Sequence, residues 1–97
     1  MDGWIVIFSL PPKLKAVEHT KFGQQFWGSV TSSWGGKYRY RRKGLMDEVK
    51  HRKLIRGVLL IKLPDVDRVR GFLEEWEAEV FVRRVRLEPD DIEHFNR

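Results

Sequence analysis

The sequence predicts a small α+β domain whose strands and helices follow one another in the order β-α-β-β-α-β. Residues 4–10 and 58–63 are apolar on both faces of a strand, as expected of the inner strands of a sheet. Residues 37–42 alternate basic residues with tyrosine, and residues 80–87 become basic in their second half, patterns typical of edge strands. Residues 66–77 repeat apolar side chains at helical spacing.

The first strand, residues 4–10, ends at Pro11-Pro12, because two prolines cannot continue a central strand. A helix is expected over residues 14–27. Four apolar side chains there can share one broad face: Leu14, Val17, Phe22 and Phe26.

Residues 29–36, rich in serine and glycine, are expected to form a loop or part of a hairpin turning at Trp34-Gly35-Gly36. The strand at 37–42 would place Tyr38 and Tyr40 on one face and basic side chains on the other. Residues 44–53 are expected to be a long connection with a helical turn at 45–49.

Asp65 follows Pro64 and is a suitable N-cap for the helix at 66–77. The apolar stripe of that helix consists of Val66, Val69, Leu73 and Trp76. After the strand at 80–87, Pro89 starts a short acidic helix in which Ile92 and Phe95 are available to dock.

The burial expected of each strand agrees with a ferredoxin-like sheet of spatial order 4-1-3-2, in which the first and third strands lie in the middle. Both helices would cover one face, leaving the other face free for a ligand or a second copy. The 97 residues (1–97) are expected to form a single basic domain, since this length suits one hydrophobic core.

The basic charge is concentrated between residues 37 and 56. This stretch has a net charge of +7, whereas the whole chain has +5, so the remainder is slightly acidic. Clustered arginine and lysine with interleaved aromatic residues suit RNA, which offers both phosphates and flat bases. A solvated basic edge strand and loop is the simpler alternative. The candidate RNA-binding residues are Trp34, Lys37, Tyr38, Arg39, Tyr40, Arg41, Arg42, Lys43, Lys50, Arg52, Lys53 and Arg56.

The cations at 39–43 and those at 50–56 are expected to be neighbours in space. If four to six of them meet phosphates, a plot of log K against log salt should have a slope of about −3 to −5. Arg83, Arg84 and Arg86 could form a second patch on the opposite edge, but pairing with acids of the second helix or the tail is favoured. Trp34 and Trp27, like the tyrosines, could stack on bases or pack internally.

Catalysis has little support in the sequence. Cysteine is absent, which excludes disulfides and thiolate metal sites. His19, His51 and His94 lack metal-ligand spacing, and no phosphate-binding loop is present. We therefore expect no enzyme activity, no metal and no cofactor. The apolar run at 4–10 is too short to span a bilayer, and the absence of disulfide chemistry suits a cytoplasmic protein.

The predicted topology resembles that of the RNA-recognition motif. Residues 5–11 resemble its first-strand signature, and Arg56-Gly57 matches the basic-glycine pair that begins its third strand. Val6 and Val58 stand at positions where that family has stacking aromatics, so the resemblance is one of fold.

In its compact, basic, cysteine-free character, the whole chain resembles small ribosomal or ribosome-associated proteins of archaea. This resemblance implies that rRNA is the partner, together with neighbouring ribosomal proteins, and that no membrane or small-molecule substrate is involved. Two alternatives remain. The chain could be a protein-interaction or assembly module that uses the free sheet face, or a protein that binds duplex DNA.

Overall fold

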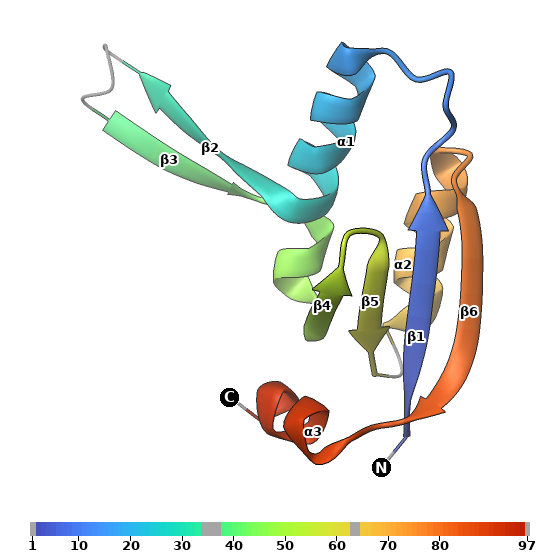
Figure 1. Ribbon diagram of the computed structural model, residues 1–97. Helices are drawn as coiled ribbons and strands as arrows, with labels where there is room; N and C mark the ends of the chain where they lie inside the picture. Colours follow the sequence, from blue (N-terminus) through green and yellow to red (C-terminus); the bar gives the residue numbers. More distant parts are fainter. Residues whose placement is uncertain (1, 34–37, 63–64, 97) are drawn as a thin grey trace. The chain divides into compact units, whose positions relative to one another are not determined.

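A computed structural model describes residues 2–33, 38–62 and 65–96 (Figure 1). The chain divides into two compact units. Unit 1 contains Met1–Pro12 and Val49–Arg97, and unit 2 contains Lys13–Glu48. None of the helices in the described ranges is long and apolar enough to cross a membrane.

Unit 1 is built on a four-stranded antiparallel sheet in the order β4-β5-β1-β6. The strands are β1 (Asp2–Ser9), β4 (His51–Ile55), β5 (Val58–Ile61) and β6 (Glu79–Arg86). β1 pairs with β6 along its whole length, from Asp2 opposite Arg86 to Ser9 opposite Glu79. The predicted α+β class and the antiparallel four-stranded sheet are therefore confirmed.

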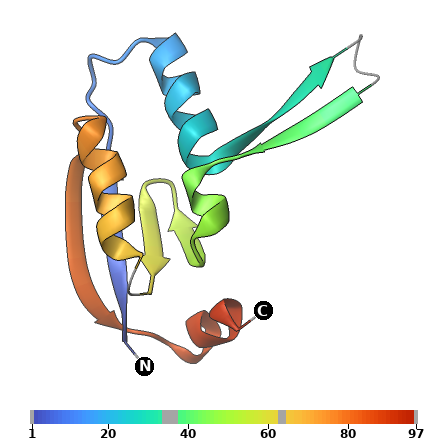
Figure 2. The ribbon, with the colours of Figure 1, turned by 180° about the vertical axis from the view of Figure 1, so that it is seen from behind.

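One face of this sheet is covered by α2 (Val66–Glu75), which lies in front of the strands in Figure 2. Val6, Leu59 and Ile61 on this face are completely buried. The helix contacts β1 and β6 and contributes its own buried stripe of Val66, Val69 and Leu73. Burial of these apolar side chains is the main stabilising contribution within unit 1.

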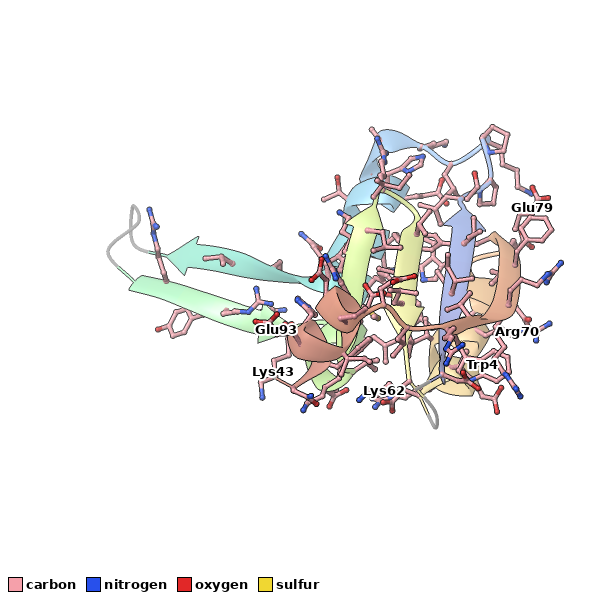
Figure 3. All side chains as sticks on the ribbon, turned by 60° about the horizontal axis from the view of Figure 1, so that its bottom comes forward. Trp4, Lys43, Lys62, Arg70, Glu79 and Glu93 are labelled. Atoms are coloured by element: carbon pink, nitrogen blue, oxygen red, sulfur yellow. The ribbon has the colours of Figure 1, made fainter. Side chains whose placement is uncertain are left out.

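The opposite face of the sheet carries α3 (Pro89–Phe95) at one end (Figures 1 and 3). A second apolar cluster joins the helix to the strands, and its members are Ile5, Leu60, Val85, Leu87, Ile92 and Phe95. The prediction that Ile92 and Phe95 of a short terminal helix would dock is confirmed.

Unit 2 contains α1 (Ala16–Trp27), β2 (Gly28–Ser33), β3 (Tyr38–Lys43) and the 3₁₀ helix η1 (Leu45–Glu48). Among the described residues, β2 and β3 pair only with each other and form a two-stranded antiparallel ribbon, which we call the basic ribbon. α1 contacts both β2 and η1. Within α1, the rings of Phe22 and Phe26 stack with centroids 5.2 Å apart.

The position predicted for the strand at 37–42 is wrong. This segment, seen as β3, belongs to the ribbon, and the edge of the four-stranded sheet next to β5 is β4. β4 begins inside the predicted long connection at 44–53, where only the helical turn, η1, is expected, and continues to Ile55. The hairpin β4–β5 closes through Arg56 and Gly57, and Gly57 has a φ of 80°, which glycine adopts without strain.

Candidate nucleic-acid interface

The predicted RNA-binding stretch is divided between the two units. Residues 39–43 lie on β3 in unit 2, whereas Lys50, Arg52, Lys53 and Arg56 belong to unit 1. Trp34 and Lys37 lie outside the described residues, and for Tyr38 only the backbone pairing with Ser33 is described.

The basic ribbon presents its cations from one strand only. Arg41 pairs with Val30, Arg42 with Ser29 and Lys43 with Gly28, so each cation stands opposite a smaller residue. In the part of the chain that the structure describes, no further strand pairs with either β2 or β3. All five residues from Arg39 to Lys43 are exposed to solvent.

Arg41 is held at the base of the ribbon by Asp47. Its Nη2 donates to Asp47 Oδ1 at 2.5 Å and to the Trp27 carbonyl at 3.4 Å. The other carboxylate oxygen of Asp47 accepts the backbone N–H of Gly44 at 2.9 Å. The Gly44 N–H and the Arg41 guanidinium hold the pKa of the Asp47 carboxyl below its usual range. Arg41 therefore fixes the ribbon to η1 and α1.

Two glycines allow the chain segments at this base to come close together. Gly28, which joins α1 to β2, has a φ of 95°. A Cβ on Gly44 would lie 2.2 Å from the Gly28 nitrogen and 2.6 Å from the Trp27 carbonyl carbon. At position 44, only glycine fits without moving the backbone. This glycine therefore determines where the ribbon begins.

Three cations of the ribbon remain available to a ligand. Arg39, Arg42 and Lys43 are exposed and make no ion pair with any of the described residues. Tyr40, on the same strand, is 58% exposed, which rules out the alternative that it packs in the core. Exposed guanidinium and phenol groups together can meet phosphates and flat bases.

The cations of unit 1 have different surroundings. Arg52 donates to Asp91 of α3 at 2.8 Å, and Lys50 donates to the carbonyl of Phe95 at 3.2 Å. Both therefore help to hold α3 against β4. Lys53 is exposed on β4, and Arg56 is exposed in the turn between β4 and β5.

Trp27 and the arginines of β6 make contacts that only partly agree with those expected from the sequence. Trp27 is half-buried and meets Phe26 edge-to-face, with centroids 4.8 Å apart, so it packs internally. Arg84 pairs with Asp2 of β1 at 3.4 Å, instead of the predicted acids of α2 or the tail. Arg83 lies over the ring of Phe81 at 5.9 Å.

Histidines serve local structure in unit 1. His51 Nδ1 lies 2.8 Å from the Val49 carbonyl, and His94 Nε2 lies 3.1 Å from the His51 carbonyl. No cluster of three or more potential metal ligands occurs among residues 2–33, 38–62 and 65–96.

Sequence reasoning missed two features of the surface. The sequence analysis assigns no contact to Asp47, although its spacing from Gly44 is typical of a turn in which a carboxylate accepts a nearby backbone N–H. Phe81 and Ile7 were treated as strand residues, yet both are partly exposed. Comparisons with protein-family models, curated proteins and solved structures found no match.

Proposed function

We propose that this chain is a non-catalytic cytoplasmic RNA-binding protein, a ribosomal or ribosome-associated component that contacts rRNA phosphates through the basic ribbon. The observation that carries the proposal is the set of three exposed cations, Arg39, Arg42 and Lys43, on a ribbon fixed at its base. On β3, Arg39 and Lys43 share one face and Arg42 lies on the other face with Tyr40, so an RNA that contacts all three would follow the exposed edge of the ribbon.

The fixed base of the ribbon and Tyr40 would also strengthen the contact. The Arg41–Asp47 pair and the Gly28–Gly44 approach fix the base of β3, so less conformational entropy is lost when the free cations bind. Tyr40 adds a ring on which an unpaired base can stack, a contact worth about 1–3 kcal/mol.

Within this proposal, the fold is a ferredoxin-like domain in which the ribbon is an insertion. β1, α1, β4, β5, α2 and β6 would supply the β-α-β-β-α-β order, with α1 beside α2 on one sheet face. The test is nuclear Overhauser contacts between protons of α1 and those of the four-stranded sheet. A full assignment without any such contact would refute the ferredoxin-like arrangement and leave the RNA proposal standing.

The experiment for RNA binding compares two variants of the same net charge. One carries Arg39→Glu, Arg42→Glu and Lys43→Glu, and the control carries Lys21→Glu, Arg68→Glu and Arg70→Glu on exposed positions of α1 and α2. Affinity for a structured rRNA fragment is measured by fluorescence anisotropy between low and high salt. We expect the ribbon variant to bind at least about tenfold more weakly at about 0.1 M salt, and the control to bind nearly as the parent.

The salt dependence of the parent protein gives a second readout. With Arg41 and Arg52 already paired to acids, three phosphate contacts predict a slope of about −2 to −3 for log K against log salt. Equal loss of affinity in both variants would mean that overall charge, and not the ribbon, drives binding. Equal affinity for duplex DNA and structured RNA would favour the duplex-DNA alternative, for which a two-stranded ribbon also has suitable dimensions.

A further inference from the structure

The sheet face opposite α2 has two halves with different surroundings. At one end, Ile5, Leu60 and Val85 pack against α3 through Ile92 and Phe95. Figure 3 shows α3 in front of this end of the sheet. This half of the face is a completed interface between a sheet and a short helix.

The other half of the same face carries a row of apolar side chains, one from each strand. Ile55 pairs with Val58, Val58 pairs with Ile7, and Ile7 pairs with Phe81. Ile7 is two residues from Ile5, and Phe81 is four residues from Val85, so the row lies on the face that α3 uses. We call Ile55, Val58, Ile7 and Phe81 the apolar row.

The apolar row is open to solvent in the described structure. Ile55 is 68% exposed, Phe81 45% and Ile7 39%, while Val58 is half-buried. Single exposed apolar residues are normal on protein surfaces, but three exposed side chains and a half-buried one in adjacent positions across a sheet indicate an interaction surface.

Basic residues flank the apolar row at both edges of the sheet. Arg83 lies over the Phe81 ring, and Arg56 directly follows Ile55. Neither forms an ion pair with an acid within the described parts of the chain. Glu79, on the same face of β6, lies beyond the row on the side away from Arg83.

The docked α3 shows which chemistry suits this face. It is an acidic helix that places Ile92 and Phe95 on the sheet and Asp91 on Arg52. The apolar row continues that interface with the same two kinds of group: apolar side chains in the middle, and at the sides guanidinium groups that have no ion pair among the described residues.

We propose that the apolar row is a docking surface for an acidic amphipathic helix of a partner protein. Ile55, Val58, Ile7 and Phe81 receive the apolar stripe of the helix, and Arg83 and Arg56 meet its carboxylates. Three of the four row residues are aliphatic and offer no π-face for a base, so protein is favoured over RNA at this surface.

The test uses a capped synthetic peptide of about 15 residues, long enough to form a helix. The peptide carries isoleucine and phenylalanine three residues apart, as in α3, and glutamates on its opposite face. It is titrated into the full ¹⁵N-labelled chain and followed by amide chemical shifts. We expect shifts around Ile7, Val58 and Phe81. A peptide of the same composition in scrambled order should shift these amides little.

Two variants and one control locate the site. Phe81→Ser and Arg83→Glu should each weaken the peptide affinity at least about fivefold. The control Val30→Ser removes an exposed apolar side chain of the basic ribbon and should bind as the parent. The ribbon variant with three glutamates should also bind the peptide, which separates this proposal from RNA binding.

Several results would overturn the proposal. Equal binding of the scrambled peptide would show non-specific adhesion, and shifts restricted to α3 and Leu60 would show displacement of α3. Shifts of the apolar row by single-stranded RNA, with loss of peptide binding, would make the row a base-binding surface. Self-association of the free chain that shields the row at working concentration would assign it to a second copy.

Discussion

Four arginines on two strands, β3 and β4, show how local contacts decide what a charge can do. Arg41 is committed to Asp47 and the Trp27 carbonyl, whereas Arg39 and Arg42 on the same strand have no acid partner among the described residues. Arg52 on β4 is committed to Asp91. In the sequence these residues are equivalent members of one basic stretch, but only the unpaired ones are available to a polyanion.

The Asp47 contact predicts a pH-dependent stability of unit 2. The pKa of Asp47 lies below its ordinary value of 3.8, because the Gly44 N–H and Arg41 favour the carboxylate. The stabilisation is therefore complete well above pH 3.8 and is lost as the pH falls through the pKa of the folded state. Asp47→Asn should lower the midpoint temperature at which β2 and β3 unfold at neutral pH. The unfolding is followed by NMR through the amide signals of these two strands.

The difference between Asp47→Asn and the parent should shrink as the solution is acidified past the folded-state pKa. Glu75→Gln, at an exposed position of α2, is the matched control and should leave the midpoint nearly unchanged. A difference that stays constant from neutral to acidic pH would show that the carboxylate charge does not stabilise the ribbon base.

Gly44 makes a second prediction at the scale of single residues. Gly44→Ala places a methyl group against the backbone of Trp27 and Gly28 and should lower the free energy of unfolding by about 1–3 kcal/mol. Gly23→Ala, on α1, meets nothing within 4 Å and should raise it by about 0.5–1 kcal/mol. Urea denaturation measures both, and equal effects of the two substitutions would contradict the close approach at the ribbon base.

At the scale of elements, period-2 patterns identified strands correctly but did not decide which strands pair. β1, β5, α2, β6 and α3 lie close to their predicted positions, because buried runs and a helical stripe are strong signals. β3 has the alternation expected of a strand, and within the described residues it pairs with β2 alone. The expected turn at Trp34-Gly35-Gly36 allowed a hairpin with the preceding segment, but no sequence signal decided between pairing β3 with β2 and pairing it with β5.

β4 was missed for a different physical reason. Its sequence, HRKLI, is mostly polar and its pairing is interrupted by an irregularity between Lys53 and Ile55, so it lacks clear alternation. The strand is specified by the tight turn at Arg56-Gly57 and by α3, which binds it through Arg52 and Lys50. Because β4 was missed, the sequence analysis did not anticipate that the basic stretch is divided between two units.

The docking of α3 gives a prediction at this scale. Phe95 is buried in the cluster with Leu60 and Leu87, and Phe95→Ala should lower the free energy of unfolding by about 3–5 kcal/mol or detach α3 locally. Urea denaturation reports the first effect, and faster amide hydrogen exchange in α3 and β4 reports the second. Glu93→Ala, on the exposed side of the helix, is the control. Unchanged stability together with unchanged exchange in the Phe95 variant would contradict the docked helix.

At the scale of the whole molecule, the chain carries two surfaces of different chemistry on two compact units. The basic ribbon of unit 2 offers charge and a tyrosine, and the apolar row of unit 1 offers aliphatic side chains between two arginines. A protein that holds RNA with one unit and a protein partner with the other could join the two in an assembly. The sequence indicated the first surface by its charge and a free sheet face by its strand pattern, but the side chains that line this face depend on strand register and became evident only in the structure.

The most direct test of the central claim is co-sedimentation of the protein with ribosomal particles from cell lysate on sucrose gradients at low and high salt. The parent chain is compared with a variant in which Ser29–Arg42 are replaced by Asn-Gly, a two-residue turn that suits the paired ends Gly28 and Lys43. We predict that the parent migrates with one ribosomal subunit at low salt and that the variant, with unit 1 still folded by NMR, stays at the top. Migration of the variant with the subunit, or absence of the parent from it at both salts, would contradict the account.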